Sequence, residues 1–370
     1  MPKQGKIRAM VVFGTRPEAI KMCPVVKELR ARAGFDTKVC VSGQHREMLD
    51  QVLTLFDVVP DYDLDIMRQE QTLFDITAKT LYGMQRVLAD CRPDIVLVHG
   101  DTTTAYAASV ACLYSQIPVA HVEAGLRTYN LYSPFPEEYN RQAISLVAKY
   151  HFAPTPKARD NLLREGRDPK TVYVTGNTSI DALKTTVRTD FHSEIIDWAQ
   201  GSRLLVMTAH RRENLGEPMR SMFRGIRRVV EHYEDVKLVY PVHKNPAVQA
   251  AAYEILAGHP RIRLIEPMEA DAFHNLINAS YLVLTDSGGI QEEAPALGKP
   301  VLVMRNTTER PEGLAAGTLK LVGTDEQTIF DACCRLLTDP AAYQKMSTAS
   351  NPYGDGTASV QIADILEQTM

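Results

Sequence analysis

The sequence predicts an α/β protein of two domains, each built on a parallel sheet with helices on both faces. Short apolar runs alternate with helical stretches along the chain, and these runs are apolar throughout rather than at every second position. Such runs are typical of strands that are buried on both faces. The second half repeats the pattern of the first, and 370 residues are enough for two separate cores.

The first half opens on an apolar strand, predicted at Ile7–Phe13, and a well-marked helix start. Thr15 and Glu18 have the spacing of a capping box, with Pro17 at the first helical position. Pro24 predicts a kink or a shortened first half of this helix. Apolar segments follow at Lys38–Val41, Ile95–His99, Pro118–Val122, Tyr150–Phe152 and Val172–Asn177, and helices are expected after Gly100-Asp101, at Glu137-Glu138 and near Ala158–Glu165.

The second half continues the alternation after a polar stretch with weak periodicity, Ala182–Gly201. Its strands are predicted at Leu204–Thr208, Val236–Val242, Arg263–Ile265, Leu282–Thr285 and Pro300–Met304. We place the domain boundary close to Gly176, which gives domains at 1–176 and 177–356.

Composition excludes several classes of protein. The net charge of −4 and the pI near 6.2 provide no basic field for nucleic acid. No apolar run has the length of a membrane span, and the N-terminus lacks the features of a signal peptide. The six cysteines are scattered and fit buried thiols in a reducing cytoplasm better than disulfides or zinc ligands. We therefore expect a cytoplasmic protein without nucleic-acid or membrane partners.

Ionisable and polar residues gather where the predicted strands end. In open α/β sheets, ligands bind at the carboxyl ends of the strands. A scaffold alone does not require so many charged groups there, so these ends are candidate functional positions. They carry Arg16, Asp101, Glu123, His210, His243, Ser287 and Arg310.

The stretch Tyr281–Glu293 predicts an anion site. It reads as a buried strand, a turn at Ser287-Gly288-Gly289 and the opening of a helix. The first N–H groups of a helix lack partners inside it, and the helix dipole favours negative charge there. We interpret the turn as a diphosphate-binding site. Glu292 and Glu293 lie one turn inside the predicted helix, where a carboxylate can reach a ribose hydroxyl. The alternative is a strand-to-helix turn capped by Ser287.

Structural alternatives exist for the other candidates too. Asp101 has the position of an N-cap, and Glu137 and Glu138 could be first-turn acids. His210 and His243 could be core histidines, although the run from His210 to Asn214 is too polar for a core.

No metal or cofactor site is predicted. The acidic segment Asp61–Asp65 lies between helical stretches and is interpreted as a solvated loop rather than a metal-binding DxD. The chain has no HExxH or P-loop motif, and no GxGxxG follows the first strand, so a nicotinamide cofactor is not expected.

At this point the sequence resembles the bacterial non-hydrolysing UDP-N-acetylglucosamine 2-epimerases over essentially its whole length. Each motif alone is modest, but their combination in this order is highly specific. The motifs are FGTRPEAIKM (13–22), QHREMLDQV (44–52), VLVHGDTTT (96–104), HVEAGLRT (121–128), SPFPEE (133–138), TGNTSIDAL (175–183), TAHRRENLGEPMR (208–220), YPVHKNP (240–246), LTDSGGIQEEAP (284–295), TTERPE (307–312) and NPYGDG (351–356).

The resemblance implies a glycosyltransferase B type fold, with two Rossmann-like domains facing across a cleft and a final helix, 357–370, returning to the first domain. It implies that Asp101, Glu123 and Glu137 transfer protons and that His210 is a further catalytic residue in contact with the ligand. The implied substrate-binding residues are Arg16, Lys21, His243, Met268, Phe273, Ser287, Gly288, Gly289, Glu293 and Arg310. Ser287–Gly289 and Arg16 would bind the diphosphate, Glu293 the ribose, and Phe273 and the backbone near Met268 the uracil.

Regulation and assembly are also implied by the resemblance. Gln44, His45 and Arg211 match the region where some bacterial members bind a second UDP-GlcNAc as an activator. The family is commonly homodimeric and supplies surface polysaccharides. We expect both for this chain on the resemblance alone.

The implied reaction is epimerisation of UDP-GlcNAc to UDP-ManNAc. No carbonyl acidifies the C2 hydrogen of the sugar, and oxidation at C3 would need the nicotinamide site that the sequence lacks. The remaining route eliminates UDP to give 2-acetamidoglucal, which then recombines with UDP. A hydrolysing epimerase, a UDP-sugar-dependent glycosyltransferase and a nucleotide-sugar sensor are the alternatives.

Overall fold

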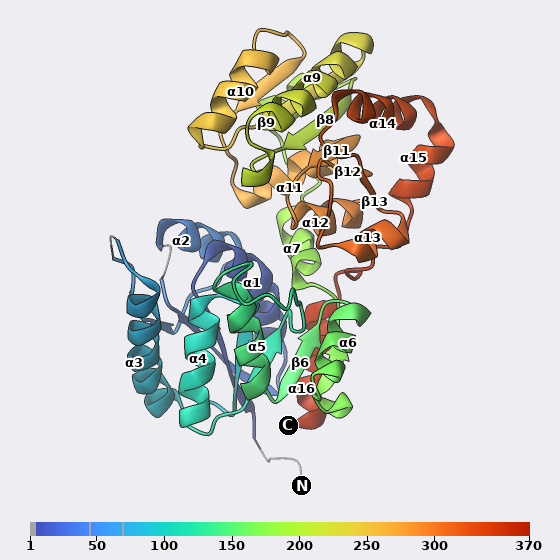
Figure 1. Ribbon diagram of the computed structural model, residues 1–370. Helices are drawn as coiled ribbons and strands as arrows, with labels where there is room; N and C mark the ends of the chain where they lie inside the picture. The colour runs from blue at the N-terminus through green and yellow to red at the C-terminus, as the bar shows by residue number, and fades with distance from the viewer. Residues whose placement is uncertain (1–4, 44–45, 69) are drawn as a thin grey trace. The chain divides into compact units, whose positions relative to one another are not determined.

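The computed structural model describes residues 5–43, 46–68 and 70–370, and the strands of this part form two sheets (Figure 1). The strands of the first sheet are β1 (Ile7–Phe13), β2 (Phe35–Val41), β3 (Tyr62–Asp63), β4 (Ile95–His99), β5 (Val119–Val122), β6 (Tyr150–Ala153) and β7 (Val172–Val174). Those of the second are β8 (Arg203–Thr208), β9 (Val236–Pro241), β10 (Ile262–Ile265), β11 (Leu282–Thr285), β12 (Val301–Val303) and β13 (Leu319–Leu321).

Helices connect the strands. In the first half they are α1 (Arg16–Ala31), α2 (Arg46–Leu55), α3 (Leu73–Cys91), α4 (Thr103–Tyr114), α5 (Glu137–Val147), α6 (Pro156–Arg164) and α7 (Thr178–Thr186). In the second half they are α8 (Glu194–Ala199), α9 (Glu217–His232), α10 (Pro246–Leu256), α11 (Ala270–Ala279), α12 (Ile290–Ala296), α13 (Pro311–Ala316), α14 (Glu326–Thr338), α15 (Pro340–Ser347) and α16 (Ala358–Thr369).

Both sheets are doubly wound. Their strand orders are β3-β2-β1-β4-β5-β6-β7 and β10-β9-β8-β11-β12-β13, and all of the pairings are parallel. In each sheet the winding direction reverses beside its first strand, which is the Rossmann-like arrangement that binds ligands at the switch point. The predicted α/β class with two Rossmann-like domains is therefore confirmed.

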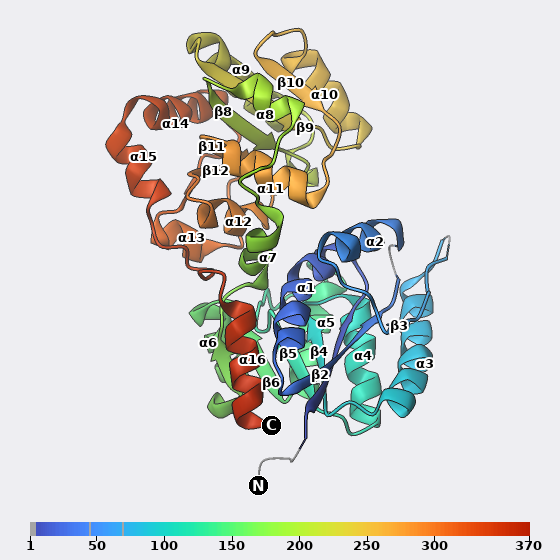
Figure 2. The same cartoon turned by 180° about the vertical axis from the view of Figure 1, so that it is seen from behind.

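The core of the first unit lies on both faces of its sheet. Alternate residues of β1 separate into two clusters, with Val11 and Phe13 packed among residues of α1, α2 and α16, and Met10 and Val12 among residues of α3 and α4. Figure 2 shows α16 alongside α1. Strands buried on both faces explain why the sequence runs are continuously apolar.

The helix start after β1 forms as predicted. The Thr15 side chain accepts a hydrogen bond from the Glu18 N–H, and Glu18 accepts from the Thr15 N–H in return. The helix is not shortened at Pro24, because α1 runs from Arg16 to Ala31 with Pro24 inside it.

The domain boundary lies later than the predicted Gly176. The first unit extends to Thr185 and includes Tyr353–Met370, whereas the second comprises Thr186–Pro352. Helix α7 belongs to the first unit because Ala182 packs in its core and the Asp181 carboxylate accepts hydrogen bonds from the N–H groups of Ala358 and Ser359. The weak periodicity of the stretch that follows Ala182 concealed this helix.

The second unit repeats the layered arrangement. Alternate residues of β8 again face opposite layers, with Leu205 and Met207 packed among residues of α9, α10 and α14. On the other face, Val206 packs with residues of α8 and α11. Among the residues that the model describes, no helix is both long and apolar enough to cross a membrane.

Two buried histidines in the first sheet predict a loss of stability in mild acid. His121 and His151 are register partners on β5 and β6, and burial lowers the pKa of His121 to about 3 and that of His151 to about 4. The two histidines of the unfolded chain take up protons near pH 6.5, whereas those of the folded chain stay neutral. Between pH 6.5 and 4, each histidine therefore lowers the free energy of unfolding by about 1.4 kcal/mol for every unit by which the pH falls.

Chemical denaturation of the full chain at pH 7, 6 and 5 measures this slope. We expect His151→Asn to flatten it, and His232→Asn, which changes an exposed histidine, to leave it unchanged. An identical slope in wild type and His151→Asn would contradict the assignment to this pair.

Candidate active site

Glu123 follows β5 directly and lies in a polar cluster of the first unit. Its carboxylate accepts hydrogen bonds from Lys21 Nζ and, at 3.0 Å, from Asn177 Nδ2. The ring Nε2 of His99, at the end of β4, lies 3.5 Å from the same carboxylate and has no hydrogen-bond partner among the described residues. The sequence predicted Lys21 and Glu123, but it did not single out His99 or Asn177, although both lie in quoted motifs.

The cluster keeps Glu123 charged in a strained backbone position. Its φ of +61° is in the left-handed region, which costs a non-glycine residue on the order of 1 kcal/mol or more. Burial alone would raise the pKa of Glu123, but Lys21 and His99 more than offset burial and hold that pKa well below its usual value. Glu123 is therefore a carboxylate at neutral pH, the form that can accept a proton.

Asp101 is not the N-cap that its position suggested, because the Thr102 side chain caps α4 instead. The Asp101 carboxylate pairs with Arg141 of α5, whose Nε and terminal nitrogen lie 2.8 and 2.7 Å from Oδ2. Gly100, which precedes Asp101, lies close to Glu123, since a β-carbon at Gly100 would lie 3.8 Å from Glu123 Oε1. Arg141 was not predicted, because a partner about 40 residues away in sequence leaves no local signal.

The adjacent acids Glu137 and Glu138 have different environments. Glu138 is fully buried and accepts hydrogen bonds from the N–H groups of Thr128 and Tyr129 and from Gln142. Glu137 is half-buried at the first position of α5, and within the described residues its carboxylate has no hydrogen bond or ion pair. Glu138 therefore fixes the loop before α5, whereas Glu137 remains available for chemistry.

The predicted anion turn follows β11 in the second unit. Gly289, not Ser287, is the N-cap of α12, and no side chain caps it, so the alternative of a serine cap is wrong. The Ser287 N–H is occupied by Thr285 Oγ1 at 2.9 Å, so the amides of Gly288 and its successors are the ones that could meet a ligand. A β-carbon at Gly288 would lie 3.8 Å from an Arg310 nitrogen and 3.9 Å from an Arg211 nitrogen.

Two acids of α12 hold neighbouring side chains in this region. Glu292 is buried and pairs with Arg310, whereas Glu293 lies 3.5 Å from His274 Nε2. A β-carbon at Gly289 would lie 3.8 Å from Glu293, which brings this carboxylate to the turn. Phe273 and Met268, the predicted uracil contacts, are partly buried against a shared apolar cluster beside β8.

His210 and His243 follow the adjacent strands β8 and β9. Their rings stack with centroids 5.5 Å apart and planes at 17°. Neither is a core histidine, since His243 is exposed and the His210 side chain is 39% exposed. The backbone N–H groups of His210 and Arg211 donate to Asp286, which lies in the LTDSGGIQEEAP motif but was not predicted as a site residue.

The remaining predicted residues are spread over both units. Arg16 is the first residue of α1 and is half-buried. Gln44 and His45 lie outside the described residues. Arg211, the third predicted regulatory residue, donates through Nε to the Asp286 carbonyl oxygen and lies 3.6 Å from Glu309.

The acidic segment near β3 is not a loop between helices. Tyr62 and Asp63 pair with β2, and Asp61 forms ion pairs with Arg30 and Lys38 at 3.4 and 3.5 Å. Among the residues described, no group of three or more His, Cys, Asp or Glu side chains could hold a metal ion.

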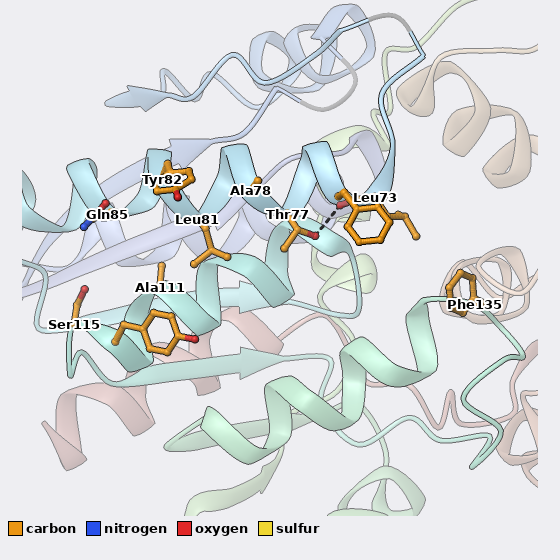
Figure 3. A pocket seen from close by; sticks show the side chains of 11 residues that line it. Leu73, Thr77, Ala78, Leu81, Tyr82, Gln85, Ala111, Ser115 and Phe135 are labelled. Carbon is orange, nitrogen blue, oxygen red and sulfur yellow. Dashed lines mark hydrogen bonds between the residues drawn. The ribbon is translucent and has the colours of Figure 1, made fainter.

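A groove of about 840 Å³ lies between α3 and α4, apart from the charged strand ends (Figure 3). Its walls include Leu81 and Tyr82 of α3 and Ala111 of α4, and Phe135 also borders it. None of the lining residues is charged, so this groove contains no carboxylate or imidazole for acid–base chemistry.

Comparisons with known proteins give a consistent family. The family model described as UDP-N-acetylglucosamine 2-epimerase matches residues 27–367. A UDP-N-acetylglucosamine 2-epimerase of Bacillus subtilis (strain 168) is 57% identical over 361 residues, which are 98% of this chain and 95% of the relative.

Solved structures agree with the sequence matches. One from Listeria monocytogenes, assigned the same activity, has a TM-score of 0.95 at 55% identity and covers 98% of this chain and 96% of its own. A UDP-GlcNAc 2-epimerase from Neisseria meningitidis has a TM-score of 0.87 at 48% identity, covering 98% of this chain and 100% of its own. The chain therefore belongs to the UDP-N-acetylglucosamine 2-epimerase family, as its motifs predicted.

Proposed function

We propose that the chain is a non-hydrolysing epimerase that interconverts UDP-GlcNAc and UDP-ManNAc through 2-acetamidoglucal and free UDP. The observation that carries the proposal is the ionised Glu123, held by Lys21 at the carboxyl end of the first sheet. Two relatives support UDP-GlcNAc as the substrate. The Neisseria meningitidis structure holds UDP-GlcNAc, and the structure of an S. aureus relative, 50% identical, holds UDP.

In the proposed elimination, a carboxylate removes the C2 proton while the C1–O bond breaks and its electron pair leaves with UDP. The new C1–C2 double bond gives 2-acetamidoglucal. UDP then returns to C1, and an acid delivers a proton to the opposite face of C2. Asp101, Glu123 and Glu137 are the proposed proton-transfer groups, with Glu123 suited to accept because it is ionised.

The reaction also requires stabilisation of the negative charge on the departing diphosphate. General acid–base catalysis supplies about 10²–10⁴-fold, so fixed positive charge and N–H dipoles must contribute much of the rest. We propose that Arg16, Arg310 and the amides after Ser287 stabilise the leaving UDP, while Lys21 and His243 help to bind the sugar nucleotide. The ribose would bind Glu293, and the uracil would lie near Phe273 and Met268.

Incubating UDP-GlcNAc with the enzyme in deuterated water and following the reaction by NMR tests the function. We expect UDP-ManNAc with deuterium at C2. Release of free ManNAc would indicate a hydrolysing epimerase. Turnover only after an acceptor is added would indicate a glycosyltransferase. UDP-ManNAc without deuterium would exclude the elimination route.

We propose that the product supplies ManNAc units for surface polysaccharide and that the enzyme works in the cytoplasm. The resemblance to bacterial epimerases supports the first, and six free cysteines are consistent with the second. Release of labelled ManNAc from the polysaccharide of cells fed labelled precursor, and its loss on deletion of this gene, would test the pathway. Fractionation of the same cells would test the compartment.

Activation by UDP-GlcNAc is a second proposal that rests on the family resemblance, with Gln44, His45 and Arg211 as the matching positions. Turnover of pure UDP-ManNAc tests it. A lag that UDP-GlcNAc removes is expected, whereas full activity from the start would contradict activation.

We also propose a homodimer, in which a second copy covers the groove between α3 and α4. Phe74, Tyr114 and Tyr82 beside it are 88%, 76% and 69% exposed, which is unusual for aromatic side chains on one face. Because the lining carries no charge, the face meets its own copy without like-charge repulsion, as a two-fold contact requires.

Sedimentation velocity tests the dimer. We expect wild type to sediment as a dimer and Phe74→Glu combined with Tyr82→Glu as a monomer. Tyr253→Glu, at a 53% exposed tyrosine of α10, is the matched control and should remain dimeric. A monomeric wild type, or a dimeric double variant, would contradict the proposed face.

A further inference from the structure

Asp286 is a buried carboxylate that joins the two functional segments of the second unit. It follows β11 and immediately precedes the turn at Ser287, and it has no exposed surface. Burying a charged group is costly unless hydrogen bonds compensate for the lost water. The contacts of Asp286 therefore indicate why the fold retains it.

Among the described residues, the hydrogen-bond partners of the Asp286 carboxylate come from the segment after β8. Its carboxylate accepts hydrogen bonds from the N–H groups of His210 and Arg211, both at 2.9 Å, and from Asn214 Nδ2 at 3.3 Å. Its Oδ1 also lies 3.3 Å from the ring Nδ1 of His210. One carboxylate thus binds the backbone N–H of His210 and lies within ion-pair distance of its ring.

Hydrogen-bond chemistry assigns the proton on this ring. An ionised carboxylate has only acceptor atoms, so it favours hydrogen on the ring nitrogen that lies 3.3 Å from it, Nδ1. The second ring nitrogen of His210, Nε2, then carries a lone pair when the imidazole is neutral. His243 stacks on the same ring and accepts a hydrogen bond through its own Nδ1 from the Asn245 N–H at 3.1 Å, which restrains the plane of the stack.

We propose that Asp286 is the positioning residue for His210: it holds the imidazole in the tautomer with hydrogen on Nδ1 and leaves Nε2 to accept a hydrogen bond or a proton from the sugar nucleotide. The proposal deepens the proposed function and rests on it for the identity of that ligand. It implies that anion binding belongs to the arginines and backbone amides rather than to His210.

The groups around the ring are consistent with a neutral imidazole. Burial lowers the pKa of His210, Asp286 opposes this effect, and His243 and Arg211 add to the lowering. Asp286 therefore orients the ring without fixing a permanent positive charge on it.

Nitrogen-15 NMR of the wild-type imidazoles tests the tautomer without any variant or any turnover. At pH 7.5 we expect His210 to show a protonated Nδ1 and an unprotonated Nε2, whereas exposed His232 should show an ordinary tautomer mixture. A protonated Nε2 with an unprotonated Nδ1 on His210 would overturn the proposal. Because this readout needs no epimerase activity, it separates the positioning role from the proposed function.

A double-mutant cycle tests whether Asp286 acts through His210. Asp286→Asn should lower kcat by about 10–100-fold, as removal of an orienting partner does in other sites. In a His210→Ala background the same change should cost less than about twofold, because the group that Asp286 orients is absent. Equal losses in both backgrounds would show that Asp286 supports only the fold.

Asp235→Asn provides the matched control, since it changes another aspartate of the second unit that is paired with Arg203 at 2.7 Å and lies at the surface. It should leave kcat unchanged in both backgrounds. If Asp286→Asn does not fold, the wild-type tautomer still decides the proposal.

Discussion

Glu123→Gln is expected to lower kcat by about 10²–10⁴-fold while leaving the affinity for UDP unchanged, because the amide keeps the size of the side chain but can no longer accept a proton. The buried environment makes this substitution informative. Lys21 and His99 outweigh burial and hold the pKa of the carboxylate well below its usual value, so it is ionised at neutral pH.

Steady-state kinetics with UDP-GlcNAc and calorimetry with UDP separate the two quantities. Glu165→Gln is the matched control, because Glu165 is also ion-paired in the first unit, at 2.8 Å from Arg127 Nε, but belongs to the end of α6. We expect it to change kcat by less than about threefold. Asp101→Asn and Glu137→Gln should resemble Glu123→Gln, and an active triple variant would refute the carboxylate assignment.

Much of the fold could be predicted because buried parallel strands leave a strong signal. The runs at Ile7–Phe13, Ile95–His99 and Leu282–Thr285 have the same bounds in the structure. Helix α7 was missed, because its contacts are with α16 and the first core rather than with sequence neighbours. Apolar periodicity identifies a helix that packs one apolar face on the core and exposes its other face to water. Helix α7 is not such a helix.

The site was predicted less completely than the fold, for a physical reason. Sequence position indicates which residues follow strands, but it does not indicate which of two adjacent acids turns inward. Glu138 binds the N–H groups of Thr128 and Tyr129, and nothing local distinguishes it from Glu137. Asp286 was hidden in the same way, because its partners lie some 75 residues away in sequence.

Gly288→Ala is expected to weaken UDP binding by about 10–100-fold without destabilising the protein. Gly288 has no left-handed φ, and a β-carbon there would lie at ordinary contact distance, 3.8 Å from Arg310 and 3.9 Å from Arg211. The free protein therefore accommodates the methyl group. A diphosphate that binds between those two guanidinium groups and the turn amides would meet it.

The expected loss of UDP affinity follows from the hydrogen bonds that the methyl group would displace. A hydrogen bond to a charged group contributes about 1.5–3 kcal/mol, and each 1.4 kcal/mol is a tenfold change in Kd. Ser287→Pro should also weaken binding, but it removes the bond from the Ser287 N–H to Thr285 Oγ1 and so disturbs the turn itself. Gly288→Ala leaves that hydrogen bond in place and only obstructs the access of a ligand to the turn amides. It is therefore the more discriminating substitution.

Isothermal titration with UDP measures the affinity, and thermal unfolding of the same sample shows whether the turn is intact. A normal unfolding temperature with weakened binding is the expected pair of results. Gly5→Ala, where a β-carbon has nothing within 4 Å, is the control for a glycine replacement that no ligand meets. A stable Gly288→Ala protein with wild-type affinity would mean that the diphosphate binds elsewhere, because no phosphate could approach these amides through an added methyl group without losing contact.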